Sequence, residues 1–159
     1  MDYTPTAVDD WSAAYHRPRL KEFGSYLFVL MSAADTSQNE TNLVDVLVFA
    51  GMNFVLTVHK REVKILRTLF DTASGTGAPL AKGPGYLLFC IADSLVDTFF
   101  PAFDIIDGQV AGVESRILSD PREKVLSQLF RIKRHCLNLR KSLGPMRDVF
   151  GMQIGRAHV

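Results

Sequence analysis

The hydrophobic pattern of the chain changes about halfway along its length. In the first half, residues 23–32, 43–49 and 52–58 are rich in aromatic and β-branched side chains, and this composition predicts three strands. The short connection between the last two, at Ala50-Gly51, predicts an antiparallel hairpin. Residues 59–73 then carry apolar side chains at helical spacing, which predicts a helix.

The second half has the pattern of long helices. Apolar side chains recur in steps of three or four over about thirty residues, at Leu88, Ile91, Leu95, Phe99, Phe103, Ile106, Val110, Val113 and Ile117. Pro101 is expected to bend this helix because proline lacks a backbone donor. Ser119-Asp120-Pro121 predicts the start of a second helix. The apolar positions of that helix are Val125, Leu129, Ile132, Cys136, Leu139, Leu143 and Met146.

Together these elements predict an α+β fold. We expect a small antiparallel sheet with flanking helices, followed by a long antiparallel helical hairpin. The expected boundaries are a sheet domain at residues 1–74, a loop at 75–85 and the hairpin at 86–153.

The composition is that of an ordinary globular protein. Of the 159 residues, 47% are apolar and 22% are charged, and the formal net charge of +1 gives no indication of a nucleic-acid partner. Cys90 and Cys136 fall within apolar helical patterns, so both are expected to be reduced and buried. No run reaches the ~20 apolar residues that span a bilayer. We therefore expect the chain by itself to be soluble.

No group of residues predicts an active site. The glycine-rich residues 75–85 contain Lys82-Gly83-Pro84, whereas a phosphate loop requires Gly-Lys followed by Ser or Thr. His16, His59 and His135 lie on separate predicted elements, without the clustered partners that zinc or nucleophilic chemistry needs. We therefore predict that the chain is not an enzyme.

A basic stretch lies on the last predicted helix, at residues 131–141. A solvated helix face would explain it. The functional alternative is contact with an acidic helix of a partner subunit or with anionic lipid headgroups.

Four aspartates are candidate metal ligands. Asp93 and Asp97 are four residues apart and share a helix face, and their apolar flanks make full exposure of both unexpected. Asp9 and Asp10 begin a short helix predicted at residues 7–15. Carboxylates are hard oxygen ligands that suit Mg²⁺ with retained waters. The alternative is that each is a polar residue at a packing boundary or a charge near a helix N-terminus.

Three segments resemble the cytoplasmic domain of CorA-type divalent-cation transporters. They are Arg17-Pro18 followed by Tyr26-Leu27-Phe28, the stretch GPGYLLFCIADSLVDTFFP at residues 83–101, and RIKRHCLNLRKSLGPMRDV at residues 131–149. The resemblance implies part of an α/β/α funnel domain on the cytoplasmic face of the cell membrane. In that family the chain continues through a stalk helix into two transmembrane helices, and five subunits assemble around a pore that passes Mg²⁺ or, in one branch, Zn²⁺.

The resemblance also implies a regulatory Mg²⁺ site. It places Asp10 on the family's sensing aspartate, Asp9 beside it and Asp93 on a second sensing position, with a further aspartate on the downstream stalk helix. We expect weak, millimolar binding without that stalk. This chain departs from the family in its first long helix, which is less acidic. Gly51-Met52-Asn53 matches the family's pore signature by coincidence, because it lies between two predicted strands.

The resemblance makes the chain a fragment of a longer, homopentameric transporter that senses cytosolic Mg²⁺. The final IGRAHV, residues 154–159, resembles a translated sequencing adapter and is expected to be a non-native tail. The transported ion, whether Mg²⁺, Zn²⁺, Co²⁺ or Ni²⁺, would be selected by the pore. The alternative is a soluble helical-hairpin interaction module that shares the fold but does not take part in transport.

Overall fold

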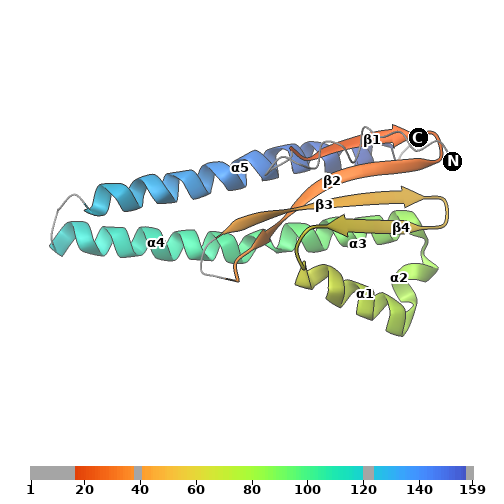
Figure 1. Ribbon diagram of the computed structural model, residues 1–159, viewed down its shortest axis with the longest axis horizontal. Helices are drawn as coiled ribbons and strands as arrows, with labels where there is room; N and C mark the ends of the chain where they lie inside the picture. Colours follow the sequence, from red (N-terminus) through yellow and green to blue (C-terminus); the bar gives the residue numbers. More distant parts are fainter. Residues whose placement is uncertain (1–16, 38–40, 120–123, 157–159) are drawn as a thin grey trace.

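The computed structural model describes residues 17–37, 41–119 and 124–156, which form one four-stranded sheet and five helices (Figure 1). The strands are β1 (Arg19–Phe23), β2 (Tyr26–Asp35), β3 (Asn42–Gly51) and β4 (Val55–His59). They pair in the order β1-β2-β3-β4, and each pair is antiparallel. The sheet and helices confirm the predicted α+β fold.

The first hairpin was not expected from the sequence. Residues 23–32 were predicted to be one strand, but Phe23 ends β1 and pairs with Tyr26, which begins β2. The two residues between them are Gly24 and Ser25, and Gly24 has a φ of 31°, in the region that glycine tolerates best. The prediction of a single strand is therefore wrong, because the aromatic run conceals a two-residue turn.

The second predicted hairpin is confirmed. β3 and β4 pair with Ala50 opposite Val55, and the N–H of Gly51 donates to the carbonyl of Phe54 at 2.9 Å. Met52, at the tip, is 93% exposed. The Gly-Met-Asn triplet thus forms a β-turn region at the end of the sheet, which agrees with its interpretation as a coincidence.

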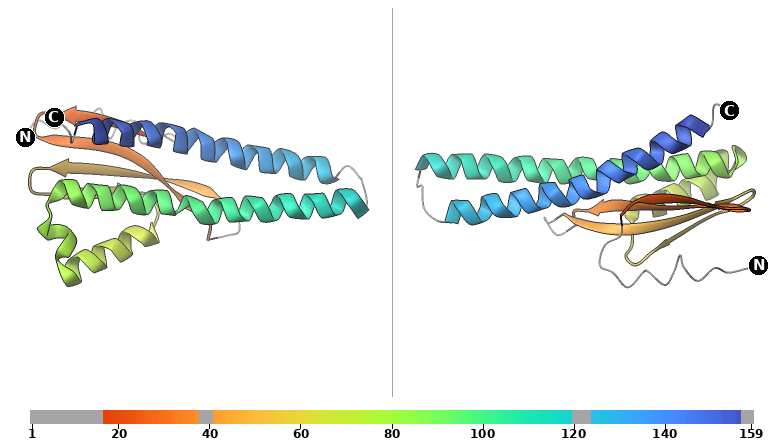
Figure 2. Two further views of the ribbon diagram at one scale, coloured as in Figure 1. Left: turned by 180° about the vertical axis from the view of Figure 1, so that it is seen from behind. Right: turned by 90° about the horizontal axis from the view of Figure 1, so that it is seen from above.

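The sheet is apolar on both faces. Alternate residues of β2 point to opposite sides, so Val29 and Met31 belong to the main core while Phe28 and Leu30 belong to a second cluster. Among the described residues, the helices lie on one side of the sheet only (Figure 2, right). Partly buried residues complete the second cluster on the other side: Phe23, Tyr26, Phe49 and Val58.

Two shorter helices follow the sheet. Residues 59–73 were predicted to be helical, but β4 extends to His59 and α1 spans Lys64–Thr76. Phe70, one of the apolar side chains of this helix, is 69% exposed. Residues 75–85, predicted to be a loop, contain the short helix α2 (Ala78–Ala81), which has a proline in its first turn.

The long helix predicted after residue 86 is divided into two. α3 spans Pro84–Asp97 and α4 spans Phe99–Ser119, with Thr98 between them. Pro101 cannot donate a hydrogen bond to the carbonyl four residues earlier, so it favours an interruption at this point. The helix is therefore interrupted close to Pro101, as its missing donor predicts.

α5 spans Lys124–Arg156 and runs antiparallel beside α4, so the two form a hairpin that extends beyond the end of the sheet (Figures 1 and 2). Its buried face agrees only in part with the predicted one: Ile132, Leu139 and Met146 are buried as expected. Leu129 and Cys136 are exposed, whereas Gln128 and His135 are half-buried. The buried residues of α5 are Ile132, Leu139, Ser142, Met146 and Val149.

The cysteines only partly follow their prediction. Both thiols are free, but Cys90 is half-buried and Cys136 is exposed. The expectation of two buried thiols is therefore wrong for Cys136. The face of α5 that packs in the core passes through His135 and leaves Cys136 outside it.

Candidate functional site

Asp93 and Asp97 lie on the outer face of α3. Gly83 precedes this helix with a φ of 87°, which glycine adopts readily, and Pro84 occupies its first turn. The opposite face is buried and includes Leu95, which is fully inaccessible. Both carboxylates are exposed. The expectation that apolar flanks would keep them from full exposure is wrong, because the apolar neighbours point towards the sheet and the aspartates point away.

Thr98 anchors the helix end next to these aspartates. Its hydroxyl donates to the carbonyl of Leu95 at 2.6 Å and accepts a hydrogen bond from the N–H of Ala34 in β2 at 2.8 Å. The break between α3 and α4 is therefore tied to the sheet, and Asp97 projects from a fixed point of the backbone.

Asp93 and Asp97 do not form a complete metal site by themselves. Within the described residues, no group of three or more His, Cys, Asp or Glu side chains could hold a metal ion. Two exposed carboxylates on adjacent turns nevertheless suit a hard cation such as Mg²⁺, which keeps several of its waters. Further ligands would have to come from residues outside this surface.

The remaining predicted ligands, Asp9 and Asp10, lie outside the described residues, together with the helix predicted at 7–15. The regulatory set of Asp9, Asp10 and Asp93 therefore stays a prediction. So does the non-native tail at residues 154–159, into which α5 extends as far as Arg156.

A polar turn that the sequence interpretation missed lies at the end of β2. The backbone N–H of Ser37 donates to Asp35 Oδ1 at 3.0 Å. This bond, a second one from the Ser37 side chain and the nearby charges of Arg61 and Lys64 lower the pKa of Asp35, against a smaller opposing effect of burial. The Asp-x-Ser spacing, typical of a side-chain-supported turn, could have indicated it.

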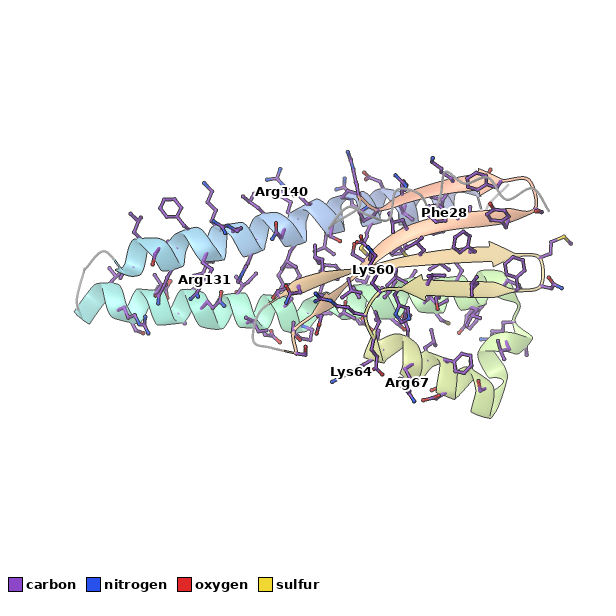
Figure 3. The ribbon with its side chains drawn as sticks, viewed as in Figure 1. Phe28, Lys60, Lys64, Arg67, Arg131 and Arg140 are labelled. Carbon is purple, nitrogen blue, oxygen red and sulfur yellow. The ribbon has the colours of Figure 1, made fainter. Side chains whose placement is uncertain are left out.

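Basic side chains gather near this turn. Lys60, Lys64 and Arg67 lie around the start of α1, and Figure 3 shows them apart from Arg131 and Arg140 on α5. Arg67 pairs with Glu62 at 3.5 Å, an exposed contact of small energetic weight.

Two pockets of similar volume lie in the described part of the chain. One of about 350 Å³ lies between β4, α1 and α3 and is mostly apolar, with Phe54, Leu69 and Ile91 in its wall. Another of about 350 Å³ is lined by Asn42, His135 and other residues of β3 and α5.

The histidines do not act together in the described part of the chain. His59 Nδ1 lies 2.6 Å from the carbonyl oxygen of Arg61 at the end of β4, and His135 lies on α5. Neither belongs to a group that could hold a metal, and His16 lies outside the described residues.

One helical stretch is long and apolar enough to cross a membrane. It lies within Pro84–Ile117, where the most apolar 18-residue window has a mean hydropathy of 1.4 and is 33% buried. The stretch meets this criterion by its length and mean composition, although Asp93 and Asp97 interrupt its apolar run, so the expectation that no run reaches ~20 apolar residues does not exclude it. Core helices meet the same criterion, and Leu95 and Phe99 of this stretch pack in the core.

Comparison with known proteins agrees with the resemblance seen in the sequence. The family model described as CorA-like Mg²⁺ transporter protein matches residues 1–156. The "Putative metal ion transporter YfjQ" of Bacillus subtilis is 28% identical over 99% of this chain and 49% of its own length. The "Cobalt/magnesium transport protein CorA" of Thermotoga maritima is 26% identical over 91% of this chain and 42% of its own length. The chain thus spans about half the length of these relatives.

Solved structures share the fold. The soluble domain of CorA from Methanocaldococcus jannaschii has a TM-score of 0.73 at 18% identity, covering 89% of this chain and 58% of that chain. The full-length CmaX protein has a TM-score of 0.66 at 21% identity, covering 94% of this chain and 46% of that chain.

Proposed function

The chain belongs to the CorA-like Mg²⁺ transporter family, and we propose that it is the part of such a transporter that responds to cytosolic Mg²⁺. The relatives are named as metal-ion transporters, and one structural neighbour is a soluble domain of CorA. In this proposal the chain catalyses no reaction. It binds a cation on the cytoplasmic side, and the bound state favours a closed channel.

The observation that carries the proposal is the position of Asp93 and Asp97 on the outer face of α3. Both carboxylates are exposed on a helix whose other face is fixed in the core and whose end is tied to β2 by Thr98. A rigid pair of hard ligands that faces outward can share a cation with a neighbouring surface.

Asp93 would hold Mg²⁺ together with Asp10 and Asp9, the residues that the family resemblance suggests. The cation supplies positive charge that carboxylates from two surfaces can share. Binding across two subunits would favour the arrangement that brings these surfaces together, because a ligand shifts an equilibrium only by its difference in affinity for the two states. Further copies of this chain, five by family resemblance, are the proposed partners.

Titration of Mg²⁺ followed by ¹⁵N NMR tests the proposal, because the method detects weak binding. We expect saturable shifts around Asp93 with a dissociation constant on the order of millimolar. Asp93→Asn and Asp10→Asn should each weaken binding severalfold, whereas the exposed Asp71→Asn on α1 serves as a control that leaves it unchanged. Equal Mg²⁺ affinity in the wild type, Asp93→Asn and Asp10→Asn would refute the site.

A second candidate function is a protein-interaction module. The observation in its favour is the part of the α4–α5 hairpin that extends beyond the sheet, where large apolar side chains such as Phe130 are exposed. A form of the protein that binds a partner through this hairpin but whose gating ignores Mg²⁺ would favour it.

A further inference from the structure

A polar pocket of about 350 Å³ lies where α5 passes the start of β3. Five of its seven lining residues in the described part of the chain have polar side chains, whereas the pocket between β4, α1 and α3 is mostly apolar. Pockets that hold small molecules have volumes of roughly 300–1,000 Å³. The size of the polar pocket therefore suits a small ligand.

Two buried polar atoms of this pocket have no hydrogen-bond partner among the described residues. They are Thr41 Oγ1, just before β3, and His135 Nδ1 on α5. The fully buried side chain of Leu139 lies in the same wall. A threonine hydroxyl can donate a hydrogen bond, and so can Nδ1 in one tautomer of imidazole. Because an unsatisfied buried polar atom is costly, the two atoms indicate that the pocket holds a hydrogen-bonding occupant.

Three exposed polar side chains complete the wall, from Asn42 on β3 and from Asn138 and Lys141 on α5. The two amides and the ammonium group can all donate hydrogen bonds. Lys141 is the charged residue of the wall, and no described lining residue is acidic. Within the described part of the chain, Lys141 takes part in no ion pair. The charge of the wall is therefore positive and uncompensated, which favours an anion.

The helix that carries this lysine is itself basic. From Lys124 to Arg147 the chain has seven lysines and arginines and no acidic residue, whereas Pro84 to Ser119 has five acidic residues and one basic residue. The formal net charge of +1 conceals this division. The pocket thus lies beside the basic arm of the helical hairpin, whose field attracts anions.

We propose that this pocket binds the phosphate group of a small molecule. A phosphate group has three or four acceptor oxygens, so it can accept hydrogen bonds from β3 and from α5 at the same time. Lys141 supplies a charge-assisted hydrogen bond, and the Thr41 hydroxyl and His135 Nδ1–H supply two neutral ones. Water could satisfy the two buried atoms, but it would leave the charge of Lys141 uncompensated.

The pocket is separate from the proposed Mg²⁺ site. Its described wall comes from β3, from the residue before it and from α5, and it contains no residue of α3, which carries Asp93 and Asp97. The two sites also suit opposite charges, because carboxylates bind cations and the wall of this pocket is positive. The inference therefore goes beyond the proposed function and does not depend on it.

A titration followed by NMR tests the inference on the full chain. The buffer contains neither phosphate nor divalent cations, and its ionic strength is held constant. We expect inorganic phosphate and glycerol 3-phosphate to cause saturable shifts of the His135 ring signals and of the side-chain amides of Asn42 and Asn138. Tighter binding of glycerol 3-phosphate would identify a phosphate ester as the ligand, and equal binding would identify free phosphate. Equal shifts with acetate would overturn the proposal.

Substitutions in the wall give a second measurement. Lys141→Met should weaken phosphate binding about tenfold, because it removes a charge-assisted hydrogen bond. Lys133→Met removes the same charge from an exposed position of α5 outside the pocket, and we expect it to leave the affinity nearly unchanged. Thr41→Val should weaken binding severalfold, whereas Thr41→Ser keeps the hydroxyl and should retain the affinity of the wild type.

Three outcomes would overturn the proposal. The first is a loss of affinity in Lys133→Met as large as in Lys141→Met, which would assign the effect to the net charge of α5. The second is unchanged affinity in both Lys141→Met and Thr41→Val. The third is a set of unsaturable shifts spread over α5. Because no divalent cation is present, phosphate binding can be observed even if the Mg²⁺ titration fails, and a failed phosphate titration leaves the Mg²⁺ proposal intact.

Discussion

Replacing Thr98 by valine tests how the break between α3 and α4 is held to the sheet. The two side chains have nearly the same shape, but valine can neither accept nor donate a hydrogen bond. The substitution therefore removes the bond from the Ala34 N–H to the Thr98 hydroxyl, 2.8 Å, and the bond from that hydroxyl to the Leu95 carbonyl, 2.6 Å.

The magnitude follows from what each group loses. The Leu95 carbonyl also accepts the backbone N–H of Thr98 at 3.3 Å, so it keeps a partner. Among the described residues, β1 offers the Ala34 N–H no alternative partner, because β1 pairs with β2 only as far as Leu30. A partly buried donor left unsatisfied costs about 1–3 kcal/mol, so we expect the free energy of unfolding to fall by about that amount.

Urea unfolding followed by circular dichroism at 222 nm measures this change. We expect the m value, the slope of the unfolding free energy against urea concentration, to stay constant. Thr98→Ser is the matched control, because it keeps the hydroxyl and removes only a methyl group. We expect it to be more stable than Thr98→Val. If the valine variant is as stable as the wild type, or more stable than the serine variant, the hydrogen bonds do not anchor the break and the reasoning is refuted.

Two further substitutions probe the core and the turn after β2. Leu95→Ala removes a fully buried side chain of the core. We expect the free energy of unfolding to fall by about 2–5 kcal/mol in the same assay. A fall smaller than that of Leu126→Ala, at an exposed position, would contradict the packing. Asp35→Asn removes a carboxylate whose pKa Ser37 lowers. The stability that the depressed pKa provides is present above the unfolded value, about 4, and is lost as the pH falls through the lower folded value. Wild type and Asp35→Asn should therefore differ in stability at pH 6, and the difference should shrink as the pH falls below about 4. A difference that does not change with pH would exclude this origin.

Much of the fold could be predicted because its signals are local. The β3–β4 hairpin follows from two apolar runs joined through Ala50-Gly51, and the interruption near Pro101 follows from the missing donor of proline. The turn at Gly24-Ser25 was missed because aromatic residues continue on both sides of it. Its signal, a Gly-Ser pair between strand-forming residues, was present in the sequence but outweighed by composition.

The candidate site was predicted less completely. The sequence identified Asp93 and Asp97 as unusual, and their spacing placed both on one face of a helix. It did not decide whether that face pointed to the core or to solvent, because the neighbouring residues are apolar all around. The structure resolves this: the helix turns Leu95 to the sheet and both aspartates outward.

The sequence by itself determined the strand or helix character of the longer segments, because the periods of two and of about 3.6 residues arise from backbone geometry within each segment. It also determined the division of charge between the hairpin arms. Only the tertiary structure decided which face of α5 is buried. Two neighbouring stripes, one with Cys136 and one with His135, both fit a helical repeat, and the angle at which α5 packs on β1, β2 and α4 selects the second. That packing depends on side chains distant in sequence.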